Sequence, residues 1–246
     1  MRIVMGGRSR HIFQDTEALA EAVAGDLQHF ISSPTENGRP LSLALSGGST
    51  PLAIFKNLRG AMPAWDWSGV FFCWGDERCV PPDDPDSNFG NADRLFFEPQ
   101  GIPRSQILRI RGENDPGEEA SRYGQMLLTR LPLENGVPVF DWIWLGIGED
   151  GHTASLFPGE AGLWNAPGPC VVAVHPRTRQ LRISITGNVI NAARRVSFLV
   201  TGRNKAPVVR EIMFQEGDFR EYPAASVNPV PGRLEWYMDR EAASLL

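Results

Sequence analysis

Short apolar runs alternate along this chain with segments whose apolar residues recur at helical spacing. Runs of this kind are typical of strands that are buried on both faces. The expected strands are Leu41–Leu45, Val70–Trp74, Ile107–Ile110, Phe140–Leu145, Cys170–Val174, Leu181–Ile185 and Val196–Thr201.

Helical spacing is clearest over Asp15–Ile31, where Leu19, Val23 and Leu27 fall on one face and Asp15 suits an N-cap. A second helix is expected after Leu41–Leu45, with Thr50 as its cap and Pro51 at its first position. Further helices are predicted at Glu118–Leu131, Val189–Ala193 and Ala206–Phe214.

This alternation predicts an α/β fold: a doubly wound, mainly parallel sheet with helices on both faces, of Rossmann-like type. Ligands bind such sheets at the carboxyl ends of the strands. Since the sequence shows no repeat and no clear linker, we expect residues 1–246 to form a single domain.

Composition narrows the class of protein. The hydrophobic content of 42% supports a substantial core, and a net charge of -5 argues against broad binding to nucleic acid or to anionic membranes. The chain has three cysteines and no CxxC pair, which argues against a disulfide framework. With no signal-peptide-like start and no long apolar run, we expect a cytoplasmic enzyme without an obligatory protein partner.

The segment after Phe140–Leu145 contains a GxGxxG pattern that begins at Gly146 and would normally suggest a dinucleotide fold. Glu149 and Asp150 stand where a pyrophosphate would lie, and their charge has the wrong sign for it. Pro158 also prevents a long crossover helix. The glycines therefore need another explanation.

His152 follows this glycine turn, beyond a buried strand. An imidazole accepts protons near neutrality, which makes His152 the candidate general base, although a structural histidine is the open alternative. His11, His29 and His175 lie in contexts that favour no catalytic role. We assign the tryptophans to core packing: Trp65, Trp67, Trp74, Trp142 and Trp144.

The turn SGGSTP, residues 46–51, is a candidate phosphate cradle. Its glycines expose backbone N–H groups, its hydroxyls add donors, and a helix N-terminus attracts an anion. The purely structural reading, glycines followed by a helix cap, stays open. Because no Walker lysine is present, a sugar phosphate fits better than a nucleoside triphosphate.

Three further positions follow strand ends. Asp76 and Arg78 lie in a polar loop directly after Val70–Trp74, where Arg78 could grip phosphate or hydroxyl oxygens. Asn88 could contact a hydroxyl, but we favour a role as the cap of the next helix. Arg203 and Lys205 are either phosphate-binding cations or solvated charges.

Five stretches together resemble the 6-phosphogluconolactonase family, the lactone hydrolases of the pentose phosphate pathway, whose fold is related to the glucosamine-6-phosphate deaminases. They are LALSGGSTP (43–51), WGDERCVPPDDPDSNFG (74–90), LGIGEDGHTASLFPG (145–159), FLVTGRNKA (198–206) and YPAASV (222–227). The deaminases look like DEY and DGHIAFNEP where this chain has DER and DGHTASLFP. The segment HPRTRQLRISIT departs from the family pattern, so Arg177 or Arg179 could replace Arg182 in the site.

The resemblance implies hydrolysis of 6-phospho-D-glucono-1,5-lactone to 6-phosphogluconate, with neither metal nor cofactor. The catalytic residues would be His152, Asp150 and Asp76. The implied substrate-binding residues are Ser46, Gly47, Gly48, Ser49, Thr50, Arg78, Arg182 and Lys205.

Two alternatives remain open at the level of sequence. One is a deaminase or isomerase on the same fold, in which Asp76 moves protons between sugar carbons. The other is a non-catalytic sugar-phosphate sensor, although too few residues precede the first helix to form a helix-turn-helix.

Overall fold

The structure, a computed structural model, describes residues 2–5, 8–33, 35, 38–60, 65–230 and 232–246. In these residues a seven-stranded main sheet has the order β1-β2-β12-β11-β8-β3-β4. Its strands are β1 (Arg2–Met5), β2 (Arg8–Phe13), β3 (Leu41–Leu45), β4 (Val70–Trp74), β8 (Trp142–Leu145), β11 (Arg195–Val200) and β12 (Arg233–Asp239).

The main sheet is parallel except at one edge, where β1 pairs antiparallel with β2. In the pairing of β3 with β4, Leu41 lies opposite Val70 and Leu45 opposite Trp74. The carboxyl ends of both strands therefore reach the same edge of the sheet. The predicted mainly parallel α/β fold is confirmed.

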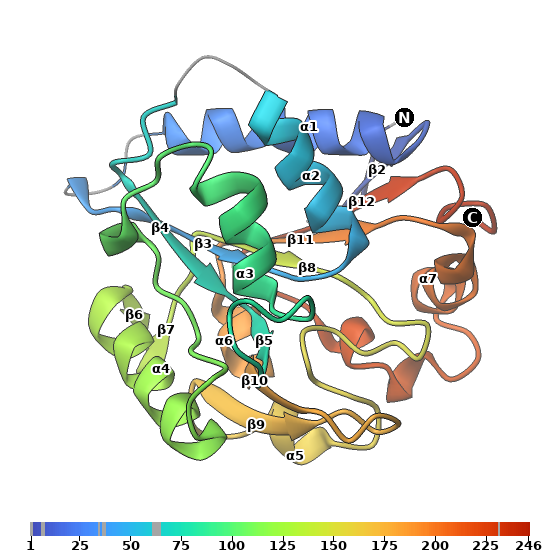
Figure 1. Ribbon diagram of the computed structural model, residues 1–246. Helices are drawn as coiled ribbons and strands as arrows, with labels where there is room; N and C mark the ends of the chain where they lie inside the picture. Colours follow the sequence, from blue (N-terminus) through green and yellow to red (C-terminus); the bar gives the residue numbers. More distant parts are fainter. Residues whose placement is uncertain (1, 6–7, 34, 36–37, 61–64, 231) are drawn as a thin grey trace.

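Helices cover both faces of the main sheet. Figure 1 shows α1 (Thr16–Ile31) and α2 (Ser49–Gly60) above it and α6 (Gly187–Ala192) below it. The predicted N-cap of the first helix is confirmed, because Asp15 Oδ1 accepts from Ala18 N at 2.9 Å. The second helix begins at Ser49, so Thr50 lies inside its first turn and the predicted cap is wrong.

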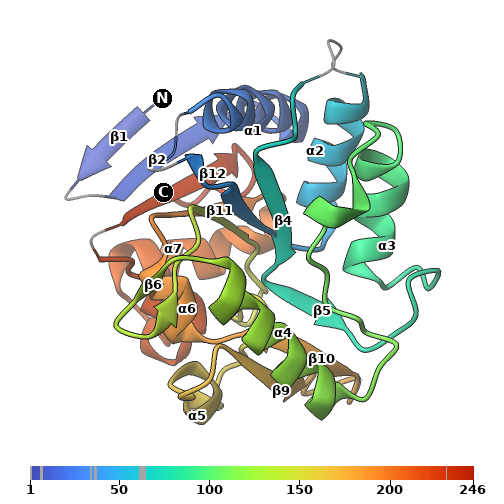
Figure 2. The same ribbon diagram turned by 90° about the vertical axis from the view of Figure 1, so that its left-hand side faces the viewer.

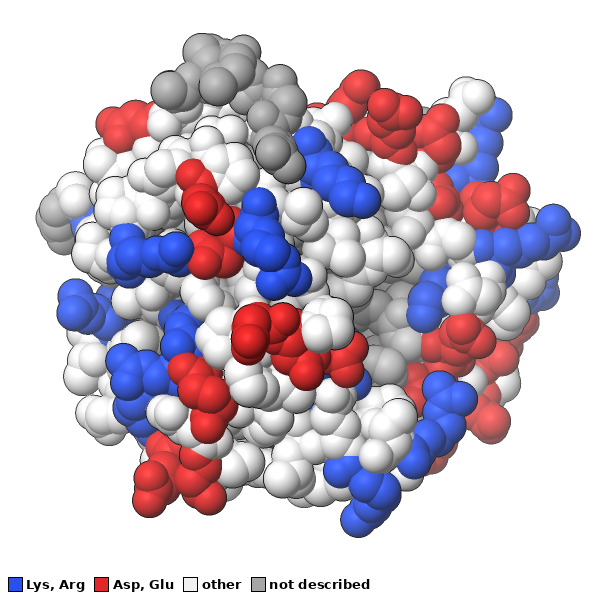
Figure 3. All heavy atoms as spheres, in the orientation of Figure 1, with Lys and Arg blue, Asp and Glu red and all other residues white. Residues whose placement is uncertain are grey.

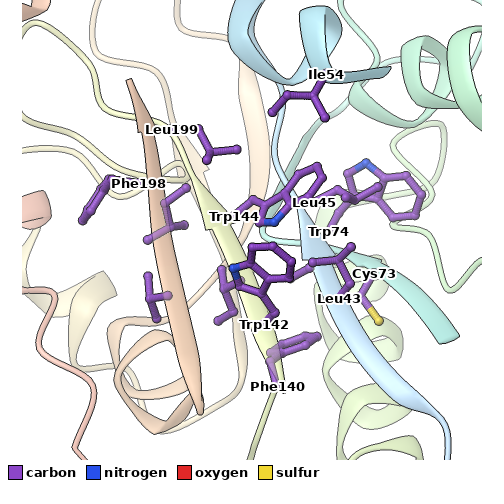
Figure 4. Packing of buried hydrophobic residues seen from close by; sticks show 14 of the residues in the cluster. Leu43, Leu45, Ile54, Cys73, Trp74, Phe140, Trp142, Trp144, Phe198 and Leu199 are labelled. Carbon is purple, nitrogen blue, oxygen red and sulfur yellow. The ribbon is translucent and has the colours of Figure 1, made fainter. Parts of the chain in front are cut away.

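Large aromatic side chains fill the space between the layers. Trp74, Trp142 and Trp144 are fully buried among leucines of β3 and helix side chains (Figure 4), as expected for core residues. Trp142 Nε1 donates to Ser197 Oγ at 2.9 Å, so this indole loses no hydrogen bond on burial.

A second, three-stranded sheet lies below the main one, with the order β5-β10-β9. It consists of β5 (Asp76–Arg78), β9 (Cys170–Val174) and β10 (Leu181–Ile185), paired antiparallel. Helix α4 (Pro116–Arg130) packs on it (Figure 2). Strands β9 and β10 were expected in the main parallel sheet. That placement is wrong, because the short turn between them allows only an antiparallel hairpin.

The predicted strand Ile107–Ile110 is also wrong. Ile107 forms an isolated bridge to Phe72 after a 3₁₀ turn, η3 (Arg104–Gln106), and the chain does not continue as a strand. The remaining elements are α3 (Asn88–Ala92), η2 (Asp93–Phe97), β6 (Leu133–Glu134), β7 (Val137–Pro138), α5 (Ala161–Trp164), η4 (Arg203–Lys205), α7 (Ala206–Phe214), η5 (Phe219–Glu221) and η6 (Pro223–Ser226).

The surface carries charge of both signs. On the face shown in Figure 3, acidic and basic side chains are intermixed rather than gathered into one field. Among the described helices, none is both long enough and apolar enough to cross a membrane.

Candidate active site

A cavity of about 170 Å³ lies where β3, β4 and β8 end. This is the edge at which a parallel sheet presents its ligand site. Larger hollows occur elsewhere on the described surface, one of them of about 460 Å³, but this one collects most of the predicted residues. Its lining is Ser46, Gly47, Gly48, Asp76, Arg78, Asn88, Gly146, Ile147, Gly148, His152, Ala154, Arg182 and Lys205.

The loop after β8 is a tight glycine turn. Gly148 N donates to His152 O at 2.9 Å, and Gly151 N donates to Gly148 O at 3.1 Å. Gly151 has φ +77°, and a Cβ there would lie 2.2 Å from the Tyr222 ring. The glycines thus serve the folding of this turn rather than a pyrophosphate, and they place His152 at the cavity wall.

His152 is paired with Asp150. The two side chains meet at 2.6 Å between Nδ1 and Oδ1, and the backbone N–H of His152 lies 3.3 Å from the same oxygen. Partial burial acts to raise the pKa of Asp150, but the hydrogen bond and charge of His152 outweigh it and lower that pKa to about 2. Asp150 is therefore a carboxylate at neutral pH, and it orients the imidazole.

Two neighbours confine this pair. A Cβ on Gly148 would lie 2.1 Å from His152 Nδ1, so only glycine lets the pair adopt this position. On another side, the ring of Phe157 lies 4.9 Å from the imidazole, centroid to centroid. The orientation of the imidazole is fixed by packing as well as by the carboxylate.

The glycine turn after β3 also lines the cavity. Gly48 has φ +100°, which favours glycine, and Ser46 Oγ is buried with no hydrogen-bond partner among the described residues. Ser49 lines an adjoining hollow of about 230 Å³. Thr50 does not line the cavity: its hydroxyl lies 2.8 Å from Thr201 Oγ1, so its substrate-binding role stays a prediction.

Two arginines lie side by side on neighbouring strands of the second sheet. Arg182 of β10 lies directly opposite Arg78 of β5 in the antiparallel register, an arrangement that is unfavourable for like charges. The Nε atoms of both are buried, and neither has a partner among the described residues. An anion between the two guanidinium groups would relieve the repulsion and satisfy these donors.

Burial also lowers the pKa of two of the cations, Arg182 and Lys205. It lowers the pKa of Arg182, and the neighbouring Arg78 acts in the same direction while Asp76 opposes it. Burial likewise lowers the pKa of Lys205, against the charges of Glu149 and Asp150. The cavity therefore holds half-buried positive charge that a phosphate could neutralise.

Asp76 lies on the same strand as Arg78 and is buried. Its Oδ2 accepts from Ser155 Oγ at 2.7 Å, which links the strand to the loop that carries His152. The segment Asp76–Arg78 was expected in a loop. That expectation is wrong, because the strand pairs with β10.

Other expectations about the site are corrected. Ser87, not Asn88, caps the next helix, since Ser87 Oγ accepts from Gly90 N at 3.0 Å, and Asn88 lines the cavity instead. Arg177 and Arg179 are exposed on the turn between β9 and β10, outside the cavity. Arg203 is exposed and also outside it.

Comparison with known proteins gives consistent matches. A family model described as "Glucosamine-6-phosphate isomerases/6-phosphogluconolactonase" matches residues 14–236. A 6-phosphogluconolactonase of Haemophilus influenzae is 44% identical over 209 residues, which cover 84% of this chain and 88% of the relative.

Solved structures agree with the sequence matches. A structure described as "Crystal Structure of devB protein" has a TM-score of 0.89 and 44% identity, and covers 96% of this chain and 98% of its own. The 6-phosphogluconolactonase from Trypanosoma brucei has a TM-score of 0.85 and 28% identity, with coverage of 96% and 98%.

Proposed function

The chain belongs to the family of glucosamine-6-phosphate isomerases and 6-phosphogluconolactonases, and we propose that His152 is the general base of a lactone hydrolysis. The enzyme is a lactonase: relatives with 44% identity over most of the chain are 6-phosphogluconolactonases. Its reaction converts 6-phospho-D-glucono-1,5-lactone to 6-phosphogluconate. The observation that carries the mechanism is one cavity lined by three cations and by His152, which is hydrogen-bonded to Asp150.

The cations hold the phosphate end of the substrate. Arg78, Arg182 and Lys205 line one cavity with the glycine turn, and Ser46 Oγ and the two arginine Nε atoms are donors that no described residue satisfies. A phosphate accepts several charge-assisted hydrogen bonds at once, which a neutral sugar does not. Anchoring the phosphate fixes the position of the lactone carbonyl, and such positioning lowers the barrier of the reaction.

The His152–Asp150 pair carries the proton transfers. With Nδ1–H donated to Asp150, Nε2 of His152 is the nitrogen that accepts a proton from water. The water oxygen attacks C1, and a tetrahedral intermediate forms. The C1–O5 bond then breaks, the imidazolium returns its proton to O5, and the new carboxylic acid loses a proton to solvent. One residue thus serves first as base and then as acid.

The roles of the remaining residues follow from their places. Asp150 orients the imidazole and stabilises its protonated form, as the carboxylate of a catalytic triad does. Asp76 is held by Ser155 at the cavity wall, where a carboxylate can accept hydrogen bonds from sugar hydroxyls. No step requires a Lewis acid, because the ester-like carbonyl of a strained lactone is already electrophilic.

The test is turnover of freshly made 6-phosphogluconolactone, measured as acid release above the background hydrolysis. Glucosamine 6-phosphate serves as the control substrate for the isomerase branch of the family. We expect lactone turnover and no ammonia release from the amino sugar. Ammonia release without lactone turnover would overturn the proposal, and binding of both sugars without turnover would indicate a sensor.

A further inference from the structure

Glu77 is a buried carboxylate that the mechanism does not use. It lies between Asp76 and Arg78 on β5, is only 1% exposed, and is not part of the cavity lining. Side chains alternate along a strand, so its two neighbours face the cavity while Glu77 points to the other side. A buried carboxylate is costly unless it is well paired, which calls for an explanation of its place.

Four donors converge on this carboxylate. Oε1 accepts from Arg78 N at 2.8 Å and Asn88 N at 2.7 Å, and Oε2 accepts from Phe89 N at 2.7 Å and Ser87 Oγ at 3.2 Å. Three of these donors belong to the first turn of α3 and to its cap. Glu77 therefore ties the start of that helix to the strand that carries Arg78.

One of the residues held in this way is Asn88. Its side chain is buried at the cavity wall, and its Nδ2 donates to Asp76 O at 2.9 Å. Its Oδ1 lies against the glycine turn, so close that a Cβ on Gly47 would be 1.9 Å from it. The carboxamide thus stands between the phosphate cradle and the strand of Asp76.

We propose that Glu77 is a positioning residue for the lactonase reaction, which holds Asn88 so that its carboxamide contacts the sugar part of the substrate. The inference rests on the proposed function, because it takes the phosphosugar lactone as the ligand of this cavity. Glu77 acts on the substrate only through Asn88 and does not touch it.

The experiment is a double-mutant cycle of Glu77→Gln and Asn88→Ala, read as KM and kcat with the lactone. A carboxamide at position 77 presents an NH₂ group to backbone N–H donors, so the first turn of α3 must shift and Asn88 with it. We expect each single variant to raise KM about tenfold, the value of one substrate hydrogen bond. Because His152 and Asp150 lie on another loop, kcat should change less than KM.

The double variant distinguishes the proposal from a general loss of structure. If Glu77 acts through Asn88, the double variant has the KM of Asn88→Ala alone, since coupled residues are not additive. Ser87→Ala is the matched control: it removes the cap and one bond to Glu77 but keeps the three backbone N–H bonds. It should lower the melting temperature and leave KM unchanged.

A binding measurement keeps the test independent of catalysis. Calorimetric titration with the product 6-phosphogluconate should show the same weakening in both single variants. If Glu77→Gln fails to fold, Glu77→Asp, which keeps the charge but retracts the oxygens by one carbon–carbon bond, replaces it in the cycle.

Three results would overturn the inference: wild-type KM in a folded Glu77 variant, wild-type KM in Asn88→Ala, or effects that multiply in the double variant. A wild-type enzyme without lactone turnover would instead refute the proposed function. The two failures are therefore distinguishable.

Discussion

The absence of a side chain at Gly148 allows His152 and Asp150 to occupy their positions in the site. A Cβ there would lie 2.1 Å from His152 Nδ1 and 2.3 Å from Asp150 Oδ1, so Gly148→Ala must displace the pair. We expect kcat/KM for the lactone to fall about 10²-fold, as misplacement of a reacting group by about 1 Å can cause. Steady-state kinetics and a thermal melt measure the two consequences separately.

Gly162→Ala is the control for this variant, because a Cβ at position 162 meets no atom within 4 Å. It should keep wild-type kinetics. A folded Gly148→Ala enzyme with wild-type kcat/KM would show that the observed contact between His152 and Asp150 is unnecessary.

Arg182 and Arg177 offer a matched comparison of charge inside and outside the cavity. Arg182 lines it opposite Arg78, whereas Arg177 is exposed on the neighbouring turn. Arg182→Ala should raise KM for the phosphorylated lactone at least tenfold and lower kcat less, because a remote phosphate contact chiefly supplies binding.

Arg177→Ala should behave as wild type. Unphosphorylated gluconolactone should be a poor substrate that Arg182→Ala hardly affects. Equal KM values for Arg182→Ala and Arg177→Ala would remove Arg182 from the phosphate site.

Independence from metal ions is a prediction that chelation tests. Among the described residues, no group of three His, Cys, Asp or Glu side chains is arranged to hold a metal ion. We expect prolonged treatment with EDTA to leave lactone turnover unchanged. Loss of activity that zinc or magnesium restores would contradict a direct role of His152 on water.

At the scale of elements, the bounds of strands were predicted most accurately where the residues of a single segment determine its structure. The strands Leu41–Leu45 and Val70–Trp74 have the predicted bounds, because short, largely apolar runs of this kind are typical of strands buried on both faces. The strand Asp76–Arg78 could not be predicted from three charged residues. It exists because β10 pairs with it and because α3 and Ser155 satisfy its two carboxylates.

The strands β2 and β12, which lie inside the main sheet, were missed for a related reason. Their segments RSRHIF and RLEWYMD carry charged residues that break the apolar pattern. In the structure, Glu235 accepts from Arg195 Nε at 2.5 Å and from Ser197 Oγ at 3.1 Å, so its burial is compensated by partners distant in sequence.

Glu77 makes the stability of α3 and its strand depend on pH. Burial raises the pKa of Glu77 from the ordinary 4.5 to about 7, with Asp76 acting in the same direction and backbone N–H bonds opposing. Between these values the folded protein binds the proton more tightly than the unfolded chain does. The contribution of Glu77 to the free energy of unfolding therefore falls as pH rises through this window.

Urea unfolding of wild type and Glu77→Gln tests this sign, because the variant cannot titrate at this position. From about pH 5 to about pH 8 the difference in stability should shift against the wild type, by up to about 3 kcal/mol. Asp76, Arg78 and Arg182 lie nearby and are present in both proteins, so any change with pH that they cause independently of Glu77 cancels in the difference. A difference that does not change with pH would contradict the raised pKa.

At the scale of the whole molecule, the site joins segments from Ser46 to Lys205 that only the fold brings together. Much of the lining could be predicted, because polar residues that directly follow buried strands must meet at the carboxyl edge of the sheet. The role of Asn88 could not, since its sequence context is equally typical of a cap. Only the tertiary bonds of Asn88 to Asp76 and Glu77 distinguish the two roles.

The measurement that tests the account most directly is the kcat of His152→Asn, together with its thermal melt. Asparagine has similar size and some hydrogen-bonding capacity but cannot accept and return a proton, so the fold should survive. We predict that kcat falls about 10² to 10⁴-fold, the usual contribution of general acid–base catalysis, while KM changes little. A variant that melts like the wild type and keeps near-wild-type kcat would contradict the assignment of His152 as the base.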